Sequence, residues 1–225
     1  MSVENHQFGH RERLRERALK SVDVLPDYEL LELFLFRTFP RGDVKPVAKA
    51  LLTRFGSLSA VMTAAMEETR TVPGVGAQAA LDLRLLGEAM LRAQRAGVQK
   101  RTVIGSWSAL LAYLKTALAN EPREQFRVLF LDAKNRLILD EVQNRGTVDH
   151  APVYAREVMR RALELSASAV ILVHNHPSGD PTPSAADIDI TRQVVEAGRG
   201  LRIAVHDHLV VGRDGVASFK ALGLF

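Results

Sequence analysis

The first part of the chain carries apolar side chains at helical spacing. From Arg11 to about Gly97 they recur three and four positions apart, which predicts a succession of amphipathic helices. Residues 28–36, 47–55 and 58–66 are three of the segments that show the pattern. Gly56 after the second segment predicts a C-terminal cap, and Ser57 predicts the entry to the third. The pattern indicates a small all-α domain at the start of the chain.

A glycine-containing turn, Val72-Pro73-Gly74-Val75-Gly76, precedes the longest of these helical segments. The turn is similar to the helix-hairpin-helix module, in which glycines let backbone N–H groups approach a DNA phosphate at a helix N-terminus. An ordinary packing corner between two helices would use glycine in the same way. Contact with DNA and simple packing are therefore both open interpretations of this turn.

Beyond residue 100 the periodicity changes to a mixture of strands and helices. Two strand-like runs, 126–132 and 137–142, flank the turn 133–136 and predict a hairpin. Further strands are expected at 169–174 and 202–211, and helices at 107–118, 154–166 and 185–197. These elements indicate a mixed α/β layer. We expect two domains, a helical one at 1–100 and an α/β one at 101–225.

Composition narrows the class of protein. Of the 225 residues, 47% are hydrophobic and 25% charged, which is typical of a soluble globular protein and not of a disordered or membrane-spanning one. The first residues lack the apolar stretch of a signal peptide. The chain has no cysteine, so a metal site must use histidine, carboxylate and water. We expect a cytoplasmic protein that does not enter a membrane.

The charge of the chain permits nucleic-acid binding without requiring it. The formal net charge is +4. Residues 1–100 hold 15 Lys/Arg and 12 Asp/Glu, and residues 101–225 hold 15 and 14. Four of the N-terminal arginines, at positions 11, 13, 15 and 17, alternate with Glu12 and Glu16 and spread around a helix. This alternation favours a solvated face over a surface that contacts DNA.

The residues most indicative of chemistry lie between positions 174 and 187. His174 and His176 are two apart at the end of a predicted strand, so both side chains point to the same face and can share one metal ion. Asp187 lies one helical turn after Ser184, behind a loop rich in proline and glycine. Two nitrogens and one carboxylate oxygen leave the fourth tetrahedral position open, as in a catalytic zinc site.

This spacing, His-x-His-Pro followed after a gap by Ser-x-x-Asp, resembles the JAMM motif of MPN-type metallopeptidases. Two segments are similar to the RadC family: residues 174–184, His-Asn-His-Pro-Ser-Gly-Asp-Pro-Thr-Pro-Ser, and the later Asp207-His208. The resemblance implies an α/β fold with cytidine-deaminase-like layering and a bound Zn²⁺. It also implies His174, His176 and Asp187 as zinc ligands, Ser184 as a hydrogen-bond donor to the oxyanion, and hydrolysis of an amide bond in an unidentified protein or peptide.

The same resemblance calls for a glutamate as general base near the first core strand. Glu124, two residues before Phe126, best matches that position, and its function would be to move a proton from the zinc-bound water to the leaving group. Glu141 and Glu157 are competitors, because the sequence does not measure the reach of a side chain to the metal.

Other interpretations stay open at this point. His206 and His208 alternate on the last predicted strand and would share a face, so a second metal is conceivable, or Asp207 or His208 orients a ligand. Ser178, Asp180 and Thr182 are interpreted as turn formers. A DNA-binding adaptor with a non-catalytic zinc domain and a metal-dependent nuclease are the alternative functions. The sequence His-Asn-His does not indicate an HNH nuclease, because the residues that give that fold its name lie far apart in sequence.

Overall fold

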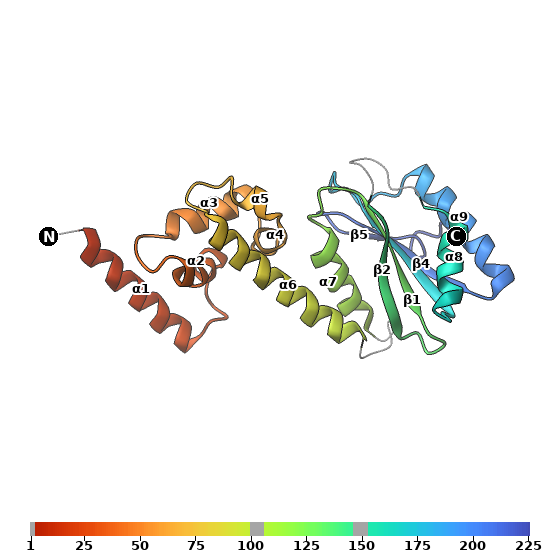
Figure 1. Ribbon diagram of the computed structural model, residues 1–225, viewed down its shortest axis with the longest axis horizontal. Coiled ribbons are helices and arrows are strands. Elements are labelled where there is room, and N and C mark those ends of the chain that lie inside the picture. The colour runs from red at the N-terminus through yellow and green to blue at the C-terminus, as the bar shows by residue number, and fades with distance from the viewer. Residues whose placement is uncertain (1–2, 100–105, 146–152) are drawn as a thin grey trace. The chain divides into compact units, whose positions relative to one another are not determined.

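The computed structural model describes residues 3–99, 106–145 and 153–225. It separates into two compact units, Met1–Met90 and Leu91–Phe225 (Figure 1). The division falls inside the helix Ala77–Gln99, whose last part packs with the C-terminal unit: Leu91 lies against the hydrophobic core there. The domain boundary expected at residue 100 stays a prediction. No helix among the described residues has both the length and the apolar character to cross a membrane.

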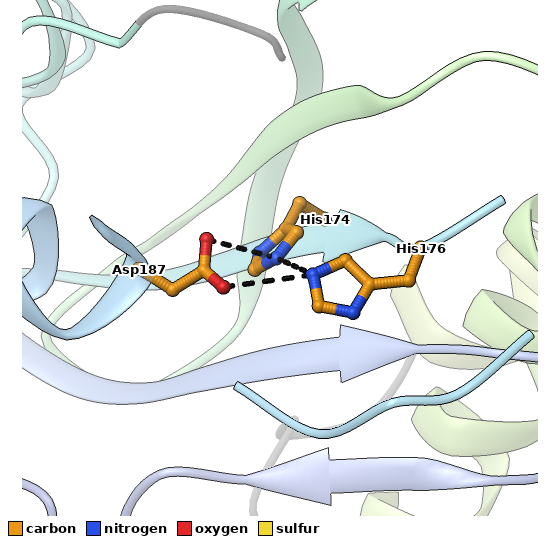
Figure 2. A group of neighbouring side chains, drawn as sticks. All are labelled: His174, His176 and Asp187. Carbon is orange, nitrogen blue, oxygen red and sulfur yellow. Dashed lines mark hydrogen bonds and ion pairs between the residues drawn. The ribbon is translucent and has the colours of Figure 1, made fainter. Parts of the chain in front are cut away.

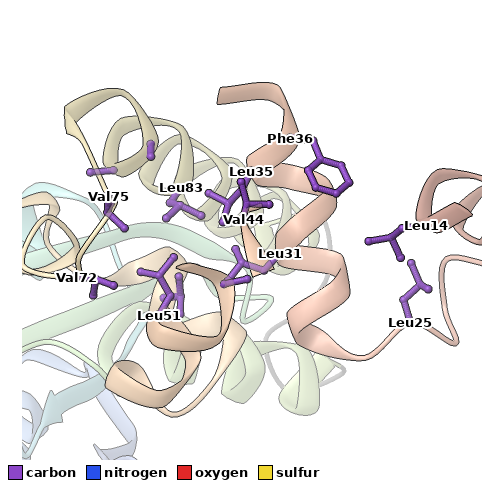
Figure 3. Close-up of a cluster of buried hydrophobic side chains, with 14 residues drawn as sticks. Leu14, Leu25, Leu31, Leu35, Phe36, Val44, Leu51, Val72, Val75 and Leu83 are labelled. Carbon is purple, nitrogen blue, oxygen red and sulfur yellow. The ribbon is translucent and has the colours of Figure 1, made fainter. Parts of the chain in front are cut away.

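The N-terminal unit consists of helices, as the apolar spacing predicts. They are α1 (Val3–Lys20), α2 (Asp27–Thr38), α3 (Lys45–Phe55), α4 (Leu58–Thr63), α5 (Met66–Thr69) and the start of α6 (Ala77–Gln99). Leucines and valines from these helices and their connections form one buried core (Figure 3). Gly56 ends α3 in the left-handed conformation, and the Ser57 side chain accepts a hydrogen bond from the Ala60 N–H. Both caps expected from the sequence are confirmed.

One expected helix is divided in the structure. The segment 58–66 was expected to be continuous, but α4 ends at Thr63 and α5 begins at Met66. Ala64 and Ala65 between them have extended backbone angles, and Ala64 is buried. Alanine prefers a helix, so the packing of Ala64 into the core overrides the local preference here.

The glycine turn before α6 needs its first glycine. Gly74 has a φ of +88°, which side chains rarely adopt, while Val72 and Val75 on either side are buried in the core. The N-terminus of α6 that follows is exposed at Ala77 and Gln78 and has no acidic residue in its first turn. The turn therefore has the backbone that the sequence indicated.

The C-terminal unit is built on one five-stranded sheet of order β2-β1-β3-β4-β5. The strands are β1 (Gln125–Leu131), β2 (Leu137–Arg145), β3 (Ala169–Asn175), β4 (Ala204–Val211) and β5 (Val216–Ser218). β3 and β4 are parallel and the other neighbours antiparallel, so the sheet is mixed as predicted. The hairpin of β1 and β2 is confirmed, whereas the short β5 was not foreseen.

Helices cover both faces of this sheet (Figure 1). α7 (Trp107–Leu118) packs on one face against Ile171 and Val173 of β3. α8 (Ala155–Glu164) and α9 (Ala185–Leu201) pack on the other face, against Val170 and Leu172. All seven residues of β3 are buried, because helices lie on both of its sides. The carboxyl end of this central strand is where the candidate residues gather.

Candidate metal centre

The two histidines lie at the carboxyl end of β3. The parallel pairing with β4 ends at Asn175, and one further hydrogen bond to β4 follows at His176. His174 pairs with Val210, and the His176 N–H donates a hydrogen bond of 3.0 Å to the Val211 carbonyl just beyond the strand. Because the strand geometry persists to His176, the two imidazoles emerge on one face as expected from their spacing. His174 is fully buried, and the side chain of His176 is 20% exposed.

Asp187 is held toward the histidines by the start of α9. Ser184 is the N-cap: its hydroxyl accepts a hydrogen bond from the Asp187 N–H, while the Ser184 N–H donates to Asp187 Oδ2 at 2.7 Å. The Ser184 hydroxyl also donates to the same oxygen at 2.6 Å. This capping box fixes the carboxylate at the helix entrance. Ser184 therefore orients Asp187 in this structure.

The three side chains converge on one point (Figure 2). Nε2 of His174 lies 3.1 Å from Nε2 of His176 and 3.2 Å from Oδ1 of Asp187. Nε2 of His176 lies 3.5 Å from Oδ2 of Asp187. Ligands about 2.0–2.1 Å from a tetrahedral zinc ion lie about 3.3 Å from one another. The distance between the two nitrogens, and that of each nitrogen to the nearer carboxylate oxygen, are close to this value.

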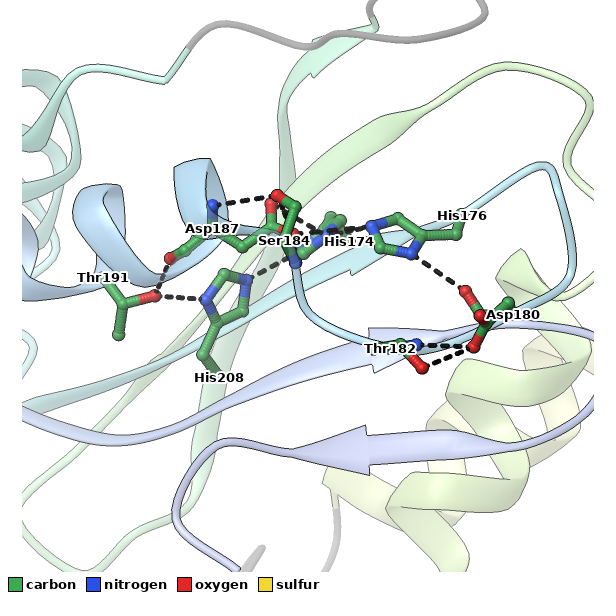
Figure 4. Close-up of polar contacts among 8 residues, drawn as sticks. All are labelled: His174, His176, Asp180, Thr182, Ser184, Asp187, Thr191 and His208. Atoms are coloured by element: carbon green, nitrogen blue, oxygen red, sulfur yellow. Dashed lines mark hydrogen bonds and ion pairs between the residues drawn. The ribbon is translucent and has the colours of Figure 1, made fainter. Parts of the chain in front are cut away.

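A chain of hydrogen bonds behind His174 determines which of its nitrogens faces this point (Figure 4). The Thr191 hydroxyl donates to the Asp187 carbonyl at 2.5 Å, so it must accept from Nδ1 of His208 at 2.6 Å. His208 is fully buried, and burial lowers its pKa well below 6.5.

A neutral His208 with a proton on Nδ1 has a lone pair on Nε2. That atom accepts a hydrogen bond from Nδ1 of His174 across 2.8 Å. The neutral His174 ring then carries its own lone pair on Nε2, the nitrogen that faces His176 and Asp187. The Asp187 carbonyl at the end of this chain can only accept a hydrogen bond. The donor and the acceptor of every other hydrogen bond in the chain follow from that.

His176 is oriented in a similar way by the loop that follows it. Its Nδ1 lies 2.9 Å from the Asp180 carbonyl, so this nitrogen carries a proton, and in the neutral ring Nε2 has the lone pair. Two imidazole lone pairs and a carboxylate thus face one another, and such a set needs a cation between its members. Imidazole nitrogen and carboxylate oxygen are donors that zinc accepts. Among the described residues, this is the group of His, Asp and Glu side chains placed to hold a metal ion.

Without an ion, protons must reduce the repulsion between these groups. The hydrogen bond to Asp187 raises the pKa of His176 against the opposing effect of burial, with smaller contributions from the Asp180 carbonyl and the charge of Glu124. Burial alone would raise the pKa of Asp187, but its bonds to His174 and His176 keep it well below the usual range. The carboxylate is therefore ionised and available as a ligand at neutral pH.

A comparison of the sequence with protein-family models identifies the family of the C-terminal unit. Residues 104–224 match the family model of the RadC-like JAB domain. The chain belongs to the RadC family. The matched region includes the whole sheet, α7 to α9 and all three convergent side chains. The fold expected from the resemblance is confirmed, and the RadC domain places the chain in the JAB/MPN superfamily, which includes metallohydrolases.

The three glutamates considered as general base lie in different surroundings. Glu124 is half-buried, and its charge contributes to the raised pKa of His176. The Glu141 carboxylate is held by the Arg161 guanidinium, with contacts of 2.7 and 2.9 Å. Glu157 accepts a hydrogen bond from Arg160 on the same helix. Of the three carboxylates, Glu124 is the one whose charge acts on a residue of the metal centre, and arginines hold the other two.

The structure also bears on the roles considered for His206, Asp207 and His208 of β4. His206 was expected to share a face with His208, but the register between β3 and β4 shifts at this point, so that Val170 pairs with Val205 and Ile171 with Asp207. The extra residue interrupts the strict alternation on which this expectation was based. His206 lies 2.6 Å from the Asn135 side chain in the hairpin turn. The second metal site has no support among the described residues.

Asp207 has a structural role, in contrast to His208. Its carboxylate is buried and accepts hydrogen bonds from the Ser218 hydroxyl and the Lys220 N–H. It thereby connects the turn after β5 to β4. His208, in contrast to Asp207, contacts His174. Of the two residues considered for orienting a ligand, His208 is the one placed to do so.

Asp180 and Thr182 form the turn that their residue types predicted. Asp180 Oδ1 accepts hydrogen bonds from both the N–H and the hydroxyl of Thr182. The Asp180 carbonyl, however, also orients His176, which was not foreseen. Thr191 and Asn175 were missed as well. Thr191 follows Asp187 by one helical turn on the same face, a spacing that could have signalled it.

Proposed function

We propose that this RadC protein is a zinc-dependent hydrolase that cleaves a peptide or isopeptide bond. The ligands would be His174, His176 and Asp187. The observation that supports the proposal is the convergence of two oriented imidazole lone pairs and an ionised carboxylate at separations that fit tetrahedral zinc. When bound, zinc would lower the pKa of a coordinated water to about 7 and polarise the substrate carbonyl.

The remaining steps belong to the side chains around the ion. Glu124 would accept a proton from the attacking water and deliver it to the leaving amine. Glu124 lies two residues before Phe126, which pairs with His174, and its charge contributes to the raised pKa of His176; both observations support this role. The Ser184 hydroxyl would turn from Asp187 to donate a hydrogen bond to the oxyanion that forms on the substrate. His208 and Thr191 would keep His174 fixed while charge develops.

Elemental analysis of the purified full-length chain tests the metal centre. We expect about one zinc per wild-type chain and none in a His176→Ala variant, because the variant loses one of the three protein ligands in such a site. His206→Ala is the matched control, since His206 contacts the hairpin turn and not the centre. Absence of metal from the wild type, even after incubation with zinc, would contradict the proposal and favour the adaptor with a non-catalytic domain.

Substrate screening then separates the two hydrolytic alternatives. The wild-type protein loaded with zinc would be incubated with peptides, isopeptide-linked proteins and DNA. We expect cleavage of an amide bond that is lost in Asp187→Ala. Cleavage of DNA that disappears in the same variant, with folding intact by circular dichroism, would identify a nuclease instead.

We also propose that the N-terminal unit associates with DNA through the turn before α6. The exposed N-terminus of α6, its first turn free of acids, and the open space around the Gly76 backbone support the approach of a phosphate. Fluorescence anisotropy with a labelled duplex would measure binding. Gly76→Glu should weaken it, whereas Gly97→Glu adds the same charge at another exposed glycine and should not. Equal binding by both variants would exclude this surface.

A further inference from the structure

Glu124 lies at a position that the sheet itself does not fix. β1 begins at Gln125, which pairs with Arg145 of β2, and the pairing with β3 begins at Phe126 opposite His174. Glu124 thus precedes both ladders, in the irregular connection between α7 and β1. A general base must stay within hydrogen-bonding reach of its proton donor. Some other contact must therefore hold this part of the backbone.

The side chain of Asn175 supplies that contact. Its Oδ1 accepts a hydrogen bond from the Gln125 N–H at 2.9 Å, and its Nδ2 donates to the carbonyls of Arg123 and Glu121, each at 3.2 Å. The bonds to residues 123 and 125 bracket Glu124 on both sides. One N–H and two carbonyls also fix which way the amide is turned, because only the oxygen can face the N–H.

Asn175 lies between the two histidines but points to the opposite face of the sheet. Successive side chains of a strand alternate, so His174 and His176 face the metal centre while Asn175 faces the end of α7. Its side chain is almost completely buried. The last residues of β3 thus position both the metal ligands and the connection that carries Glu124.

We propose that Asn175 is a positioning residue that holds Glu124 at the metal centre. This inference rests on the proposed function, since it assigns the general base to Glu124. A purely structural Asn175 would stabilise the fold without affecting the surroundings of the metal. The two roles differ in whether loss of the amide reproduces the effect of losing the Glu124 carboxylate.

Three variants of the full-length chain distinguish these roles. Asn175→Leu keeps a similar volume but removes all three hydrogen bonds. Asn175→Asp keeps the acceptor for the Gln125 N–H and replaces the two donors by an oxygen that repels the carbonyls. Glu124→Gln removes the charge of the base and leaves the backbone unchanged. Each protein would be loaded with Co²⁺ in place of zinc, because its visible absorption reports the surroundings of the ion.

We expect wild type and all three variants to bind about one metal ion per chain. The cobalt spectrum of Asn175→Leu should shift in the same direction as that of Glu124→Gln, with Asn175→Asp in between. Amide exchange measured by NMR should be on the order of tenfold faster at Gln125 in Asn175→Leu, because a buried N–H loses its acceptor. It should be unchanged in Glu124→Gln.

The unfavourable outcomes separate the two proposals. A shifted spectrum in Glu124→Gln with a wild-type spectrum in Asn175→Leu would overturn the role of Asn175 and leave the metal centre intact. Loss of metal from Asn175→Leu would also overturn it, because the residue would then act on the histidines. A wild-type protein that binds no metal, or a Glu124→Gln spectrum identical to wild type, would instead count against the proposed function.

Discussion

Nδ1 of His174 lies 2.8 Å from Nε2 of His208, and both rings are fully buried. A ligand histidine usually donates its second N–H to a carboxylate, a carbonyl or water. Here the acceptor is another imidazole, whose own proton is directed to Thr191 and, through that hydroxyl, to the Asp187 carbonyl. One hydrogen-bonded chain therefore links the candidate ligand His174 on β3 with the backbone of the candidate ligand Asp187 on α9.

Interruption of this chain should weaken metal binding. Thr191→Val keeps the shape of the side chain but removes the hydroxyl, so His208 loses the acceptor that defines its tautomer. We expect zinc affinity to fall about 10–100-fold, the usual effect of removing such an outer partner. Competition with a chromophoric chelator would measure it.

Thr191→Ser is the matched control for this experiment. It retains the hydroxyl and should bind zinc within a few-fold of the wild type. A Thr191→Val protein that binds zinc as tightly as the wild type would contradict the proposed role of this chain of hydrogen bonds.

The grouping of the candidate metal ligands could be predicted from the sequence because their spacing is local. His174 and His176 lie two apart on a strand, and Ser184 and Asp187 lie one turn apart at a helix start, so the period of each element fixes their direction. Short apolar runs predicted the hairpin and the buried strand β3 in the same way. Local rules were sufficient wherever the contacting residues belong to one element.

Contacts between elements far apart in the sequence were less predictable. The role of Asn175 depends on where the connection after α7 passes, and that of His208 on the register of β4 against β3, which contains a bulge. A period of two predicts that His206 and His208 share a face, but one extra residue interrupts the period between them. The break at Ala64 likewise follows from packing in the core and not from local preference.

Metal affinity should still change with pH at values above the ordinary pKa of a histidine. The hydrogen bond to Asp187 raises the pKa of His176 above 6.5, although burial opposes it. Because zinc must displace this proton, affinity should increase with pH through 6.5 and level off only above the raised pKa. Isothermal titration calorimetry at neutral pH, in buffers of different ionisation enthalpy, should detect proton release.

His206→Ala is the control for the pH dependence. Burial, together with the charge of Lys220, lowers the pKa of His206, and the ring lies beside the hairpin turn. The variant should keep the wild-type profile. An affinity that is constant between pH 6 and 8 would show that His176 carries no proton for zinc to displace.

The three candidate bases can be compared by removing one carboxylate at a time. We expect Glu124→Gln to lower kcat for an amide substrate about 10²–10⁴-fold with zinc content unchanged, because general-base catalysis contributes that much. Glu141→Gln and Glu157→Gln should retain most of the activity, since arginines hold both carboxylates. Steady-state kinetics and zinc analysis on the same preparations would test this. A larger loss in either control would reassign the base.

Two glycines in the turn after β4 offer a test of the loop that orients His176. A Cβ atom on Gly212 would lie 2.0 Å from the Gly179 carbonyl oxygen, so Gly212→Ala must displace the backbone next to Asp180. Because the Asp180 carbonyl sets the proton on Nδ1 of His176, we expect zinc affinity to fall about tenfold or more. Gly215 has open space around it, so Gly215→Ala should bind zinc like the wild type. Chelator competition on both variants measures the difference, and equal affinities would mean that His176 keeps its orientation without this loop.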